Sequence, residues 1–257
     1  MTNHWIDIKN SDVVLIMGSN PAENHPMSFR WVQQARKDKN ATVIVVDPRI
    51  TRSAVQADIY VPIRSGTDIA FMGGIFKYVL EQMKAHPENF NMEYVLNYTD
   101  AGFKLKDTYA FTQSEGKFSD KATWVYETDA NNWPVRIDTT DPAYWTKLWD
   151  PAERYVLGMM LQHYSRYTAE AVCSITGSPI DDYRKVQQAI AASGPKDKSM
   201  SVLYAMGTTQ HTYGSQNVRA FAVLQLLLGN IGVAGGGIMT SAVTSLDVRS
   251  TSRIFRS

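Results

Sequence analysis

Residues 12–49 constrain the fold most strongly, because their pattern is typical of a strand, a turn, a helix and a second strand. Residues 12–18 are apolar and end in glycine, which predicts a buried parallel strand leading into a tight turn. Residues 19–26 are rich in turn formers, and residues 27–39 are amphipathic. A second apolar run covers 41–47. Two parallel strands joined by a helix form half of a doubly wound fold, either Rossmann-like or flavodoxin-like.

The same alternation of strands and helices continues along the chain. A third strand is predicted over 59–63, a helix over 69–84, a fourth strand over 201–207 and a helix over 217–228. This alternation favours an α/β fold, and we predict a Rossmann-like doubly wound parallel sheet with helices on both faces. Ligands of such sheets bind at the carboxyl ends of the strands.

The stretch before the fourth strand predicts a series of helices with recognisable ends. Thr168 is expected to cap one helix and Gly177 to end it, and Ser178 is expected to cap the next. The predicted helices cover 151–167, 168–176 and 178–193.

A β-hairpin insertion is predicted over 107–150, where the composition changes. Residues 123–127 alternate as a strand, 129–132 form a turn and 133–137 run back. Four tryptophans lie between 124 and 149. Aromatic side chains can stack nucleic-acid bases, but basic residues are not interleaved with these ones. A packed insertion or a contact surface for another subunit is therefore the favoured interpretation.

Bulk properties exclude several classes of function. The net charge of +1 gives no indication of a nucleic-acid partner. Cys173 is the single cysteine, so the chain cannot hold an iron–sulfur cluster, and we expect a small buried apolar group there. The polar N-terminus has no signal-peptide pattern. Residues 220–228 are too short for a membrane span and predict a buried helix closed by Gly229.

Several spaced polar motifs follow the predicted strands. In order, they are Met1-Thr-Asn-His-Trp-Ile-Asp7, Gly18-Ser-Asn-Pro21 with His25-Pro26, Asp47-Pro-Arg49 with Thr51-Arg52, Arg64-Ser-Gly-Thr-Asp68 and Gly207-Thr-Thr-Gln-His211. Together they resemble the molybdopterin oxidoreductases, and within that family the alpha (catalytic) subunit of respiratory, selenocysteine-containing formate dehydrogenases. The resemblance covers about residues 1–238.

The resemblance implies that the loops after the strands hold a molybdopterin guanine dinucleotide. The residues expected to contact this cofactor are Gly18, Ser19, Asn20, Glu23, Asp47, Pro48, Arg49, Ser65, Gly66, Asp68, Met206, Gly207, Gln210 and His211.

The chemistry of these side chains suits such a ligand. Asp47 or Asp68 can accept hydrogen bonds from guanine N–H groups, and Arg49 can pair with a phosphate. Asn20 and Gln210 offer both donors and acceptors, which suits a pterin edge. Backbone N–H groups at strand ends and helix N-termini can bind the phosphates.

Structural alternatives remain for Asp68 and His211, and for Thr67 beside them. Thr67 and Asp68 also suit a helix N-terminus, where their oxygens accept backbone N–H bonds. His211 taken alone fits a structural histidine as well as a cofactor contact.

The family reaction oxidises formate to carbon dioxide and passes two electrons through an iron–sulfur cluster. The resemblance implies a molybdenum or tungsten centre ligated by selenocysteine or cysteine, an iron–sulfur beta subunit, a membrane cytochrome b subunit and a periplasmic location. The metal ligand, its neighbouring histidine and the cluster cysteines belong upstream of Met1. We therefore expect an internal fragment of the catalytic subunit, inactive alone, whose upstream boundary reflects the selenocysteine codon.

The last residues depart from the family pattern. Gly235-Gly-Gly237 matches the family, but the arginine expected after it is replaced by a tail rich in serine and threonine. We expect one domain over 1–238, with the insertion over 107–150, and a disordered or foreign tail over 239–257.

Two other functional classes stay open. One is a stand-alone pterin- or nucleotide-binding module without catalysis. The other is a different molybdopterin oxidoreductase, such as a nitrate or polysulfide reductase. An NAD-dependent dehydrogenase is disfavoured, because no G-x-G-x-x-G follows the first strand.

Overall fold

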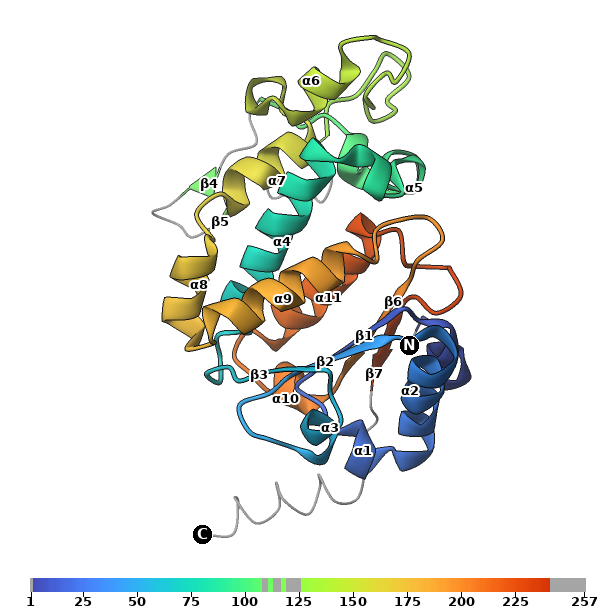
Figure 1. Cartoon of the computed structure of the whole chain (residues 1–257). Coiled ribbons are helices and arrows are strands. Elements are labelled where there is room, and N and C mark those ends of the chain that lie inside the picture. The colour runs from blue at the N-terminus through green and yellow to red at the C-terminus, as the bar shows by residue number, and fades with distance from the viewer. Residues whose placement is uncertain (1, 108–110, 113–116, 119–125, 241–257) are drawn as a thin grey trace. The chain divides into compact units, whose positions relative to one another are not determined.

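The chain forms two compact units in its computed structural model, which describes residues 2–107, 111–112, 117–118 and 126–240 (Figure 1). The first, which we call the sheet unit, comprises Met1–Asn91 and Tyr167–Ser257. The second, the insertion unit, comprises Met92–Arg166. The insertion unit therefore extends beyond the insertion predicted over 107–150.

The sheet unit contains a five-stranded parallel sheet in the order β3-β2-β1-β6-β7. The chain leaves β1 toward β2 on one side and returns to β6 on the other, which creates a topological switch point between β1 and β6. This order confirms the predicted doubly wound α/β fold. The strands are β1 (Val13–Met17), β2 (Thr42–Val46), β3 (Ile59–Val61), β6 (Met200–Tyr204) and β7 (Ile238–Thr240).

Helices cover both faces of the sheet. Their bounds are η1 (Trp5–Asn10), α1 (Pro21–Asn24), α2 (Pro26–Lys39), α3 (Arg52–Val55), α4 (Asp68–Ala85), η2 (Pro87–Asn89), α8 (Ala169–Thr176), α9 (Ile180–Ala191), α10 (Met206–Thr209) and α11 (Gly214–Leu227), where η marks a 3₁₀ helix. In Figure 1, α2 lies on one side of the sheet and α4, α9 and α11 on the other.

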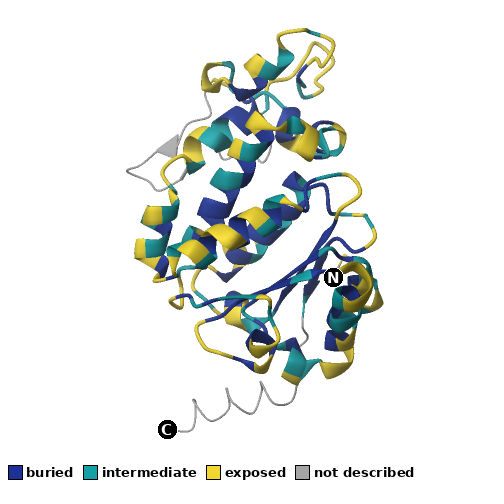
Figure 2. Ribbon diagram, viewed as in Figure 1, coloured by how far each residue is buried: buried dark blue, intermediate teal, exposed yellow. Residues whose placement is uncertain are grey.

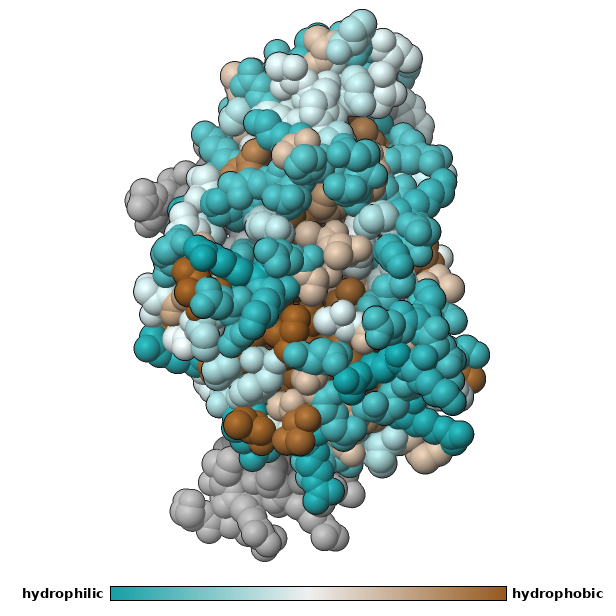
Figure 3. Space-filling model, in the orientation of Figure 1, coloured by the Kyte–Doolittle hydropathy of each residue, from teal (hydrophilic) through white to brown (hydrophobic). Residues whose placement is uncertain are grey.

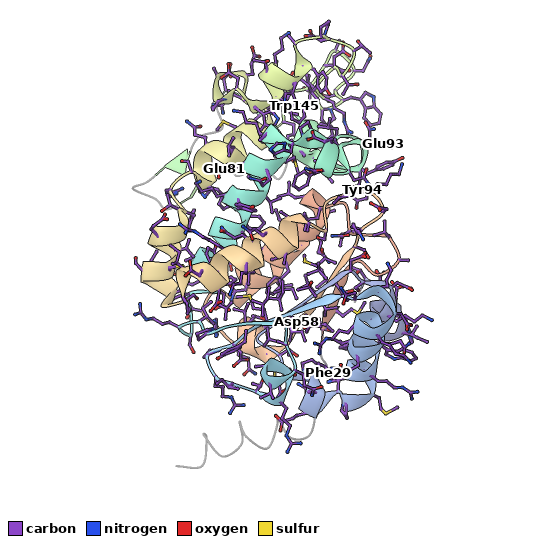
Figure 4. All side chains as sticks on the ribbon, in the orientation of Figure 1. Phe29, Asp58, Glu81, Glu93, Tyr94 and Trp145 are labelled. Atoms are coloured by element: carbon purple, nitrogen blue, oxygen red, sulfur yellow. The ribbon has the colours of Figure 1, made fainter. Side chains whose placement is uncertain are left out.

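Apolar strands pack these layers together. Val14 and Ile16 of β1 share one buried cluster with Phe29 and Val32 of α2, and Figure 4 labels Phe29. Leu15 is fully buried, and alternation along the strand directs it to the opposite face. Figure 2 shows the strands of the sheet mostly in the colour of buried residues. Since β1 and β6 are buried along their whole length, the continuous apolar runs of the sequence follow from burial on both faces.

Buried hydrogen bonds join the helices of one face. The Tyr183 hydroxyl of α9 donates to the Phe71 carbonyl of α4 at 2.7 Å, and Gln187 donates to the Gly74 carbonyl at 2.8 Å. Gln225, fully buried in α11, donates to the carbonyls of Met200 and Gly237. These hydrogen bonds therefore fix the alignment of neighbouring elements, because they require specific partners whereas apolar packing does not.

The predicted helix ends are confirmed in one case and wrong in another. Thr168 accepts the Ala171 N–H at 3.2 Å, and Gly177 ends α8 with φ 73°. Ser178 does not cap α9, because its hydroxyl donates to the Pro62 carbonyl at 2.8 Å and Pro179 is the N-cap residue. Tertiary contact with the end of β3 has replaced the local cap.

The end of the sheet unit differs from the sequence prediction. Met239 and Thr240, which we placed in a disordered or foreign tail, belong to β7 and pair with Leu203 and Tyr204 of β6. Met239 is fully buried. The sequence pattern did not predict this strand, because it is short and precedes a run of serine and threonine. Residues 241–257 lie outside the described residues.

The insertion unit is built mainly from short helices. Thr128 and Pro134 form an antiparallel bridge, and the Asp129 carboxylate accepts the N–H groups of Asn131 and Trp133 across the predicted turn. The first predicted strand lies largely outside the described residues. The elements are α5 (Met92–Tyr98), η3 (Asp100–Gly102), β4 (Phe111–Thr112), β5 (Lys117–Phe118), α6 (Tyr144–Trp149), η4 (Pro151–Glu153) and α7 (Val156–Tyr164).

The single helix predicted over 151–167 is interrupted in the structure. Arg154 adopts a left-handed conformation with φ 62° and separates η4 from α7.

Cys173 in α8 is half-buried rather than buried. Among the described residues, no helix is long and apolar enough to cross a membrane. On the face shown in Figure 3, apolar groups are separated by polar side chains.

Candidate functional site

The candidate site lies at the carboxyl edge of the parallel sheet, where the loops after β1, β2, β3 and β6 meet. All of these loops belong to the sheet unit. Parallel strands point their carboxyl ends to the same edge, so motifs distant in sequence come together there. This edge includes the switch point between β1 and β6.

Two glycines bring the loops of β1 and β6 into backbone contact. Gly207 N–H donates to the Gly18 carbonyl at 3.1 Å, and Gly18 has φ 63°. A Cβ atom at Gly207 would lie 2.7 Å from the Gly18 oxygen, and one at Gly18 would lie 2.6 Å from the Thr208 nitrogen. Glycine is therefore required at both positions for this approach.

A polar cavity of about 360 Å³ opens beside this contact. The Asp47 carboxylate is nearly buried and accepts the Arg49 N–H at 3.0 Å. Burial raises the pKa of Asp47, while the hydrogen bond and charge of Arg49 partly oppose that rise. The residues that line the cavity are Gly18, Ser19, Asn20, Asn24, Asp47, Pro48, Arg49, Thr51, Ser65, Ala205, Met206, Gly207 and His211.

A larger, mainly apolar cavity of about 810 Å³ lies next to it, and Ser65 and His211 line both. The first turns of α4 and α11 contribute to its wall. Its lining residues are Ser65, Gly66, Thr67, Ile69, Ala70, Tyr167, Ile175, Gln210, His211, Thr212, Tyr213, Gln216 and Asn217.

An Asp–His pair stands at the boundary between the two cavities. Oδ2 of Asp68 lies 3.1 Å from Nδ1 of His211. The Asp68 side chain is 8% exposed and that of His211 is 24% exposed. Burial raises the pKa of Asp68, although a backbone N–H and His211 favour its ionised form.

The structure brings most of the predicted site residues together around these cavities, and places Glu23 and Asp68 outside the linings. Glu23 instead pairs with Arg52 at 3.2 Å and accepts a hydrogen bond from the Asn20 amide. The Asn20 carbonyl oxygen accepts bonds from the backbone and hydroxyl of Ser53. Asn20 thus joins α1 to α3, and its role toward a ligand stays a prediction.

Two polar residues of the third loop have internal roles that the sequence did not reveal. The Arg64 guanidinium donates to the Ser174 and Ile175 carbonyls, both at 3.0 Å, at the end of α8. Thr67 donates to the Arg64 carbonyl at 2.7 Å, so its side chain does not cap α4 as expected.

Several lining residues were missed by sequence reasoning. Asn24 and Thr51 lie inside recognised motifs and could have been selected by their position. Tyr167 lies just before α8 and Ile175 lies within it, and both are far in sequence from any strand end. No local signal marks these two residues, because only the packing of α8 beside α4 brings them to the cavity.

Within the described parts of the chain, no group of three or more histidine, cysteine, aspartate or glutamate residues could hold a metal ion. The site consists instead of the buried Asp47 carboxylate, the exposed Arg49 guanidinium, the pair of buried Asp68 with His211, and closely packed backbone. Such a set can bind phosphates and the hydrogen-bonding edges of a heterocycle.

Comparison with known proteins identifies the relatives of this chain. The formate dehydrogenase subunit alpha of Megalodesulfovibrio gigas is 49% identical over 247 residues, which are 93% of this chain and 23% of that protein. The nitrate-inducible formate dehydrogenase major subunit of Escherichia coli K12 is 46% identical over 248 residues, with the same shares of both chains. The chain thus spans about a quarter of the length of these relatives.

A solved structure of acetylene hydratase from Pelobacter acetylenicus is similar to this chain, with a TM-score of 0.53. The similar region covers 88% of this chain and 24% of the acetylene hydratase chain. Its sequence identity is 18%, so this similarity concerns the fold alone. The sequence profile described as molybdopterin oxidoreductase matches residues 1–248, which includes the first part of the segment after 238. The chain therefore belongs to the molybdopterin oxidoreductase family.

Proposed function

We propose that this chain is part of the catalytic subunit of a formate dehydrogenase and contributes binding groups for a molybdopterin guanine dinucleotide. The observation that carries the proposal is the 49% identity to a formate dehydrogenase alpha subunit over 93% of the chain. The polar strand-end loops at the switch point support it, because that is where a doubly wound sheet binds nucleotides.

The residues around the polar cavity fit such a group by their chemistry. The Asp47 carboxylate can accept N–H groups of guanine, and the exposed Arg49 guanidinium can pair with a phosphate. Among the described residues, no carboxylate lies within ion-pairing distance of Arg49. When bound, the cofactor would supply the redox-active metal for formate oxidation, while the residues of this chain hold and orient its organic part.

The chain alone is proposed to be inactive. By the resemblance, the metal-ligating selenocysteine or cysteine is proposed to lie outside these residues. The single cysteine of the sequence, Cys173, lines neither cavity. This role as the binding part of a longer subunit agrees with the share of the relatives that the chain spans.

The finer assignments are proposals that rest on the resemblance to respiratory enzymes. They comprise molybdenum or tungsten as the metal, selenocysteine as its ligand and an iron–sulfur cluster elsewhere in the subunit. An iron–sulfur beta subunit and a membrane cytochrome b subunit are the proposed electron-transfer partners. The proposed location of the catalytic subunit is the periplasm, and the proposed process is anaerobic respiration. A nitrate or polysulfide reductase is less well supported, because these relatives are formate dehydrogenases.

A chimera tests the function. The matching 248 residues of the Escherichia coli nitrate-inducible subunit would be replaced by this chain, and formate-dependent dye reduction and bound guanine nucleotide would be measured. We expect both to be retained, and Arg49→Ala to lower the nucleotide content. A chimera that folds and assembles with its partner subunits but contains no guanine nucleotide would refute the binding role.

The flanking DNA provides a second test. An in-frame UGA codon a few dozen codons upstream, followed by a histidine codon, is expected for a selenocysteine enzyme. Stop codons in all frames on both sides would favour the alternative of a free-standing module.

That alternative is favoured by one observation. Every residue that lines the two cavities belongs to the sheet unit, so a module without the rest of the subunit would retain these groups. Calorimetry of the chain with guanosine diphosphate would measure its binding without catalysis.

A further inference from the structure

The Asp68 side chain lies against another side chain of the site and lines no cavity. It is the first residue of α4, lies 6% exposed and lines neither cavity. Its Oδ2 atom is 3.1 Å from Nδ1 of His211, which lines both cavities. Nδ1 is buried, and this close contact lacks the geometry of a good hydrogen bond, so the carboxylate is its ion-pair neighbour. Within the site, the Asp68 carboxylate thus has the His211 imidazole as its side-chain partner.

The pairing determines which atom His211 offers. An imidazole nitrogen beside a carboxylate carries the proton, so Nδ1 is protonated and the other nitrogen, Nε2, is left for other partners. In the neutral ring Nε2 is then an acceptor, suited to an N–H or O–H donor of a ligand. Without the carboxylate, either ring nitrogen could carry the proton.

We propose that Asp68 is a positioning residue that holds His211 in the Nδ1-protonated form, with Nε2 available to a ligand spanning both cavities. The proposal rests on the proposed function, and it specifies the ligand group as an N–H or O–H donor of a guanine or pterin edge. It replaces the expectation that Asp68 itself accepts hydrogen bonds from guanine.

The geometry supports action through His211 for two reasons. The Asp68 carboxylate is buried at the start of a long helix and accepts its own backbone N–H, which limits its movement beside the imidazole. Of the residues that the structure describes, Ser65 and His211 alone line both cavities, so the orientation of the His211 ring affects any ligand that spans them.

Nitrogen NMR of the full chain with ¹⁵N-labelled histidine tests the tautomer directly. The resonances of His211 would be assigned by their loss in His211→Gln, among the five histidines of the chain. Above neutral pH we expect the Nδ1-protonated form in the wild type and a shift toward the Nε2-protonated form in Asp68→Asn. Asp47→Asn, a change of the same type in the polar cavity, should leave the His211 tautomer unchanged.

The wild-type spectrum is decisive even if a variant fails to fold. An Nε2-protonated His211 in the wild type, or an unchanged tautomer in folded Asp68→Asn, would overturn the proposal.

A double-mutant cycle measured by calorimetry with guanosine diphosphate separates indirect from direct action. We expect Asp68→Asn to weaken binding about five- to tenfold, as for a lost hydrogen bond. The double variant should bind no more weakly than His211→Gln alone, because Asp68 acts through that ring. Additive losses would mean that Asp68 contacts the nucleotide itself, against the proposal. A wild-type chain that binds no nucleotide would count against the proposed function, and the tautomer would still decide the role of Asp68.

Discussion

At the scale of single residues, the site depends on close backbone contact between Gly18 and Gly207. The two glycines differ in what they require: Gly18 has a positive φ, whereas Gly207 needs space for its Cα hydrogen against the Gly18 carbonyl. Gly66 offers a comparison, because its φ is 83° but no atom lies within 4 Å of a built Cβ. Conformation and steric contact can therefore be separated by substitution.

Gly207→Ala should destabilise the chain more than Gly66→Ala. The Gly66 variant carries only the cost of a left-handed conformation, about 1–2 kcal/mol. In the Gly207 variant, the new Cβ would lie 2.7 Å from the Gly18 carbonyl oxygen, so the backbone must shift. We expect this shift to lower the free energy of unfolding by about 3 kcal/mol. Urea unfolding of both variants measures the difference, and equal losses would show that the two loops separate easily.

Asp47 should make stability depend on pH. Because burial raises its folded pKa above the ordinary value of 3.8, the folded state binds more protons between that value and the folded pKa. The contribution of this group is therefore fully present below 3.8 and is lost as the pH rises through the folded pKa. The free energy of unfolding of Asp47→Asn should rise relative to the wild type over this window. A pH-independent difference between the two proteins would contradict the assignment.

At the scale of elements, polar contacts fix how the helices above the sheet align. Tyr183 is fully buried, and its hydroxyl joins α9 to the Phe71 carbonyl of α4. Burial raises the pKa of Tyr183 well above the usual tyrosine value, so the hydroxyl remains a donor at any ordinary pH.

Tyr183→Phe should lower the free energy of unfolding by about 1 kcal/mol, because one buried hydrogen bond is lost while the ring is kept. Tyr98→Phe is the matched control, since the Tyr98 side chain is 74% exposed. Thermal or urea unfolding measures both, and a change at Tyr98 as large as that at Tyr183 would argue against a specific role for the buried bond.

At the scale of the whole molecule, the division into two units predicts where a ligand acts. Every residue of the two cavities belongs to the sheet unit. Guanosine diphosphate should therefore slow hydrogen exchange in the loops at 18–24, 47–51, 64–70 and 205–213. Peptides from 92–106 and 126–166, in the insertion unit, should exchange at an unchanged rate. Mass spectrometry measures both sets, and protection confined to the insertion unit would place the binding site elsewhere.

Local sequence patterns predicted four of the five strands of the sheet and the loops that follow them. Short-range steric and hydrophobic rules act within a few residues, so the apolar run before Gly18 and the polar run after Val46 predict a strand and its end. The same rules placed Gly18, Asp47 and Arg49 at strand ends, where the structure brings them to one cavity.

Partners that are distant in sequence were not predictable from these local patterns. Ser178 bonds to Pro62 instead of capping α9, and Met239 pairs with Leu203 instead of continuing a tail. Asp68 meets His211 instead of a cavity. In each case the partner is distant in sequence, and a hydrogen bond, an ion-pair contact or a strand pairing formed at that distance outweighs the local preference. Such partners are set by strand order and helix packing, which no local pattern contains.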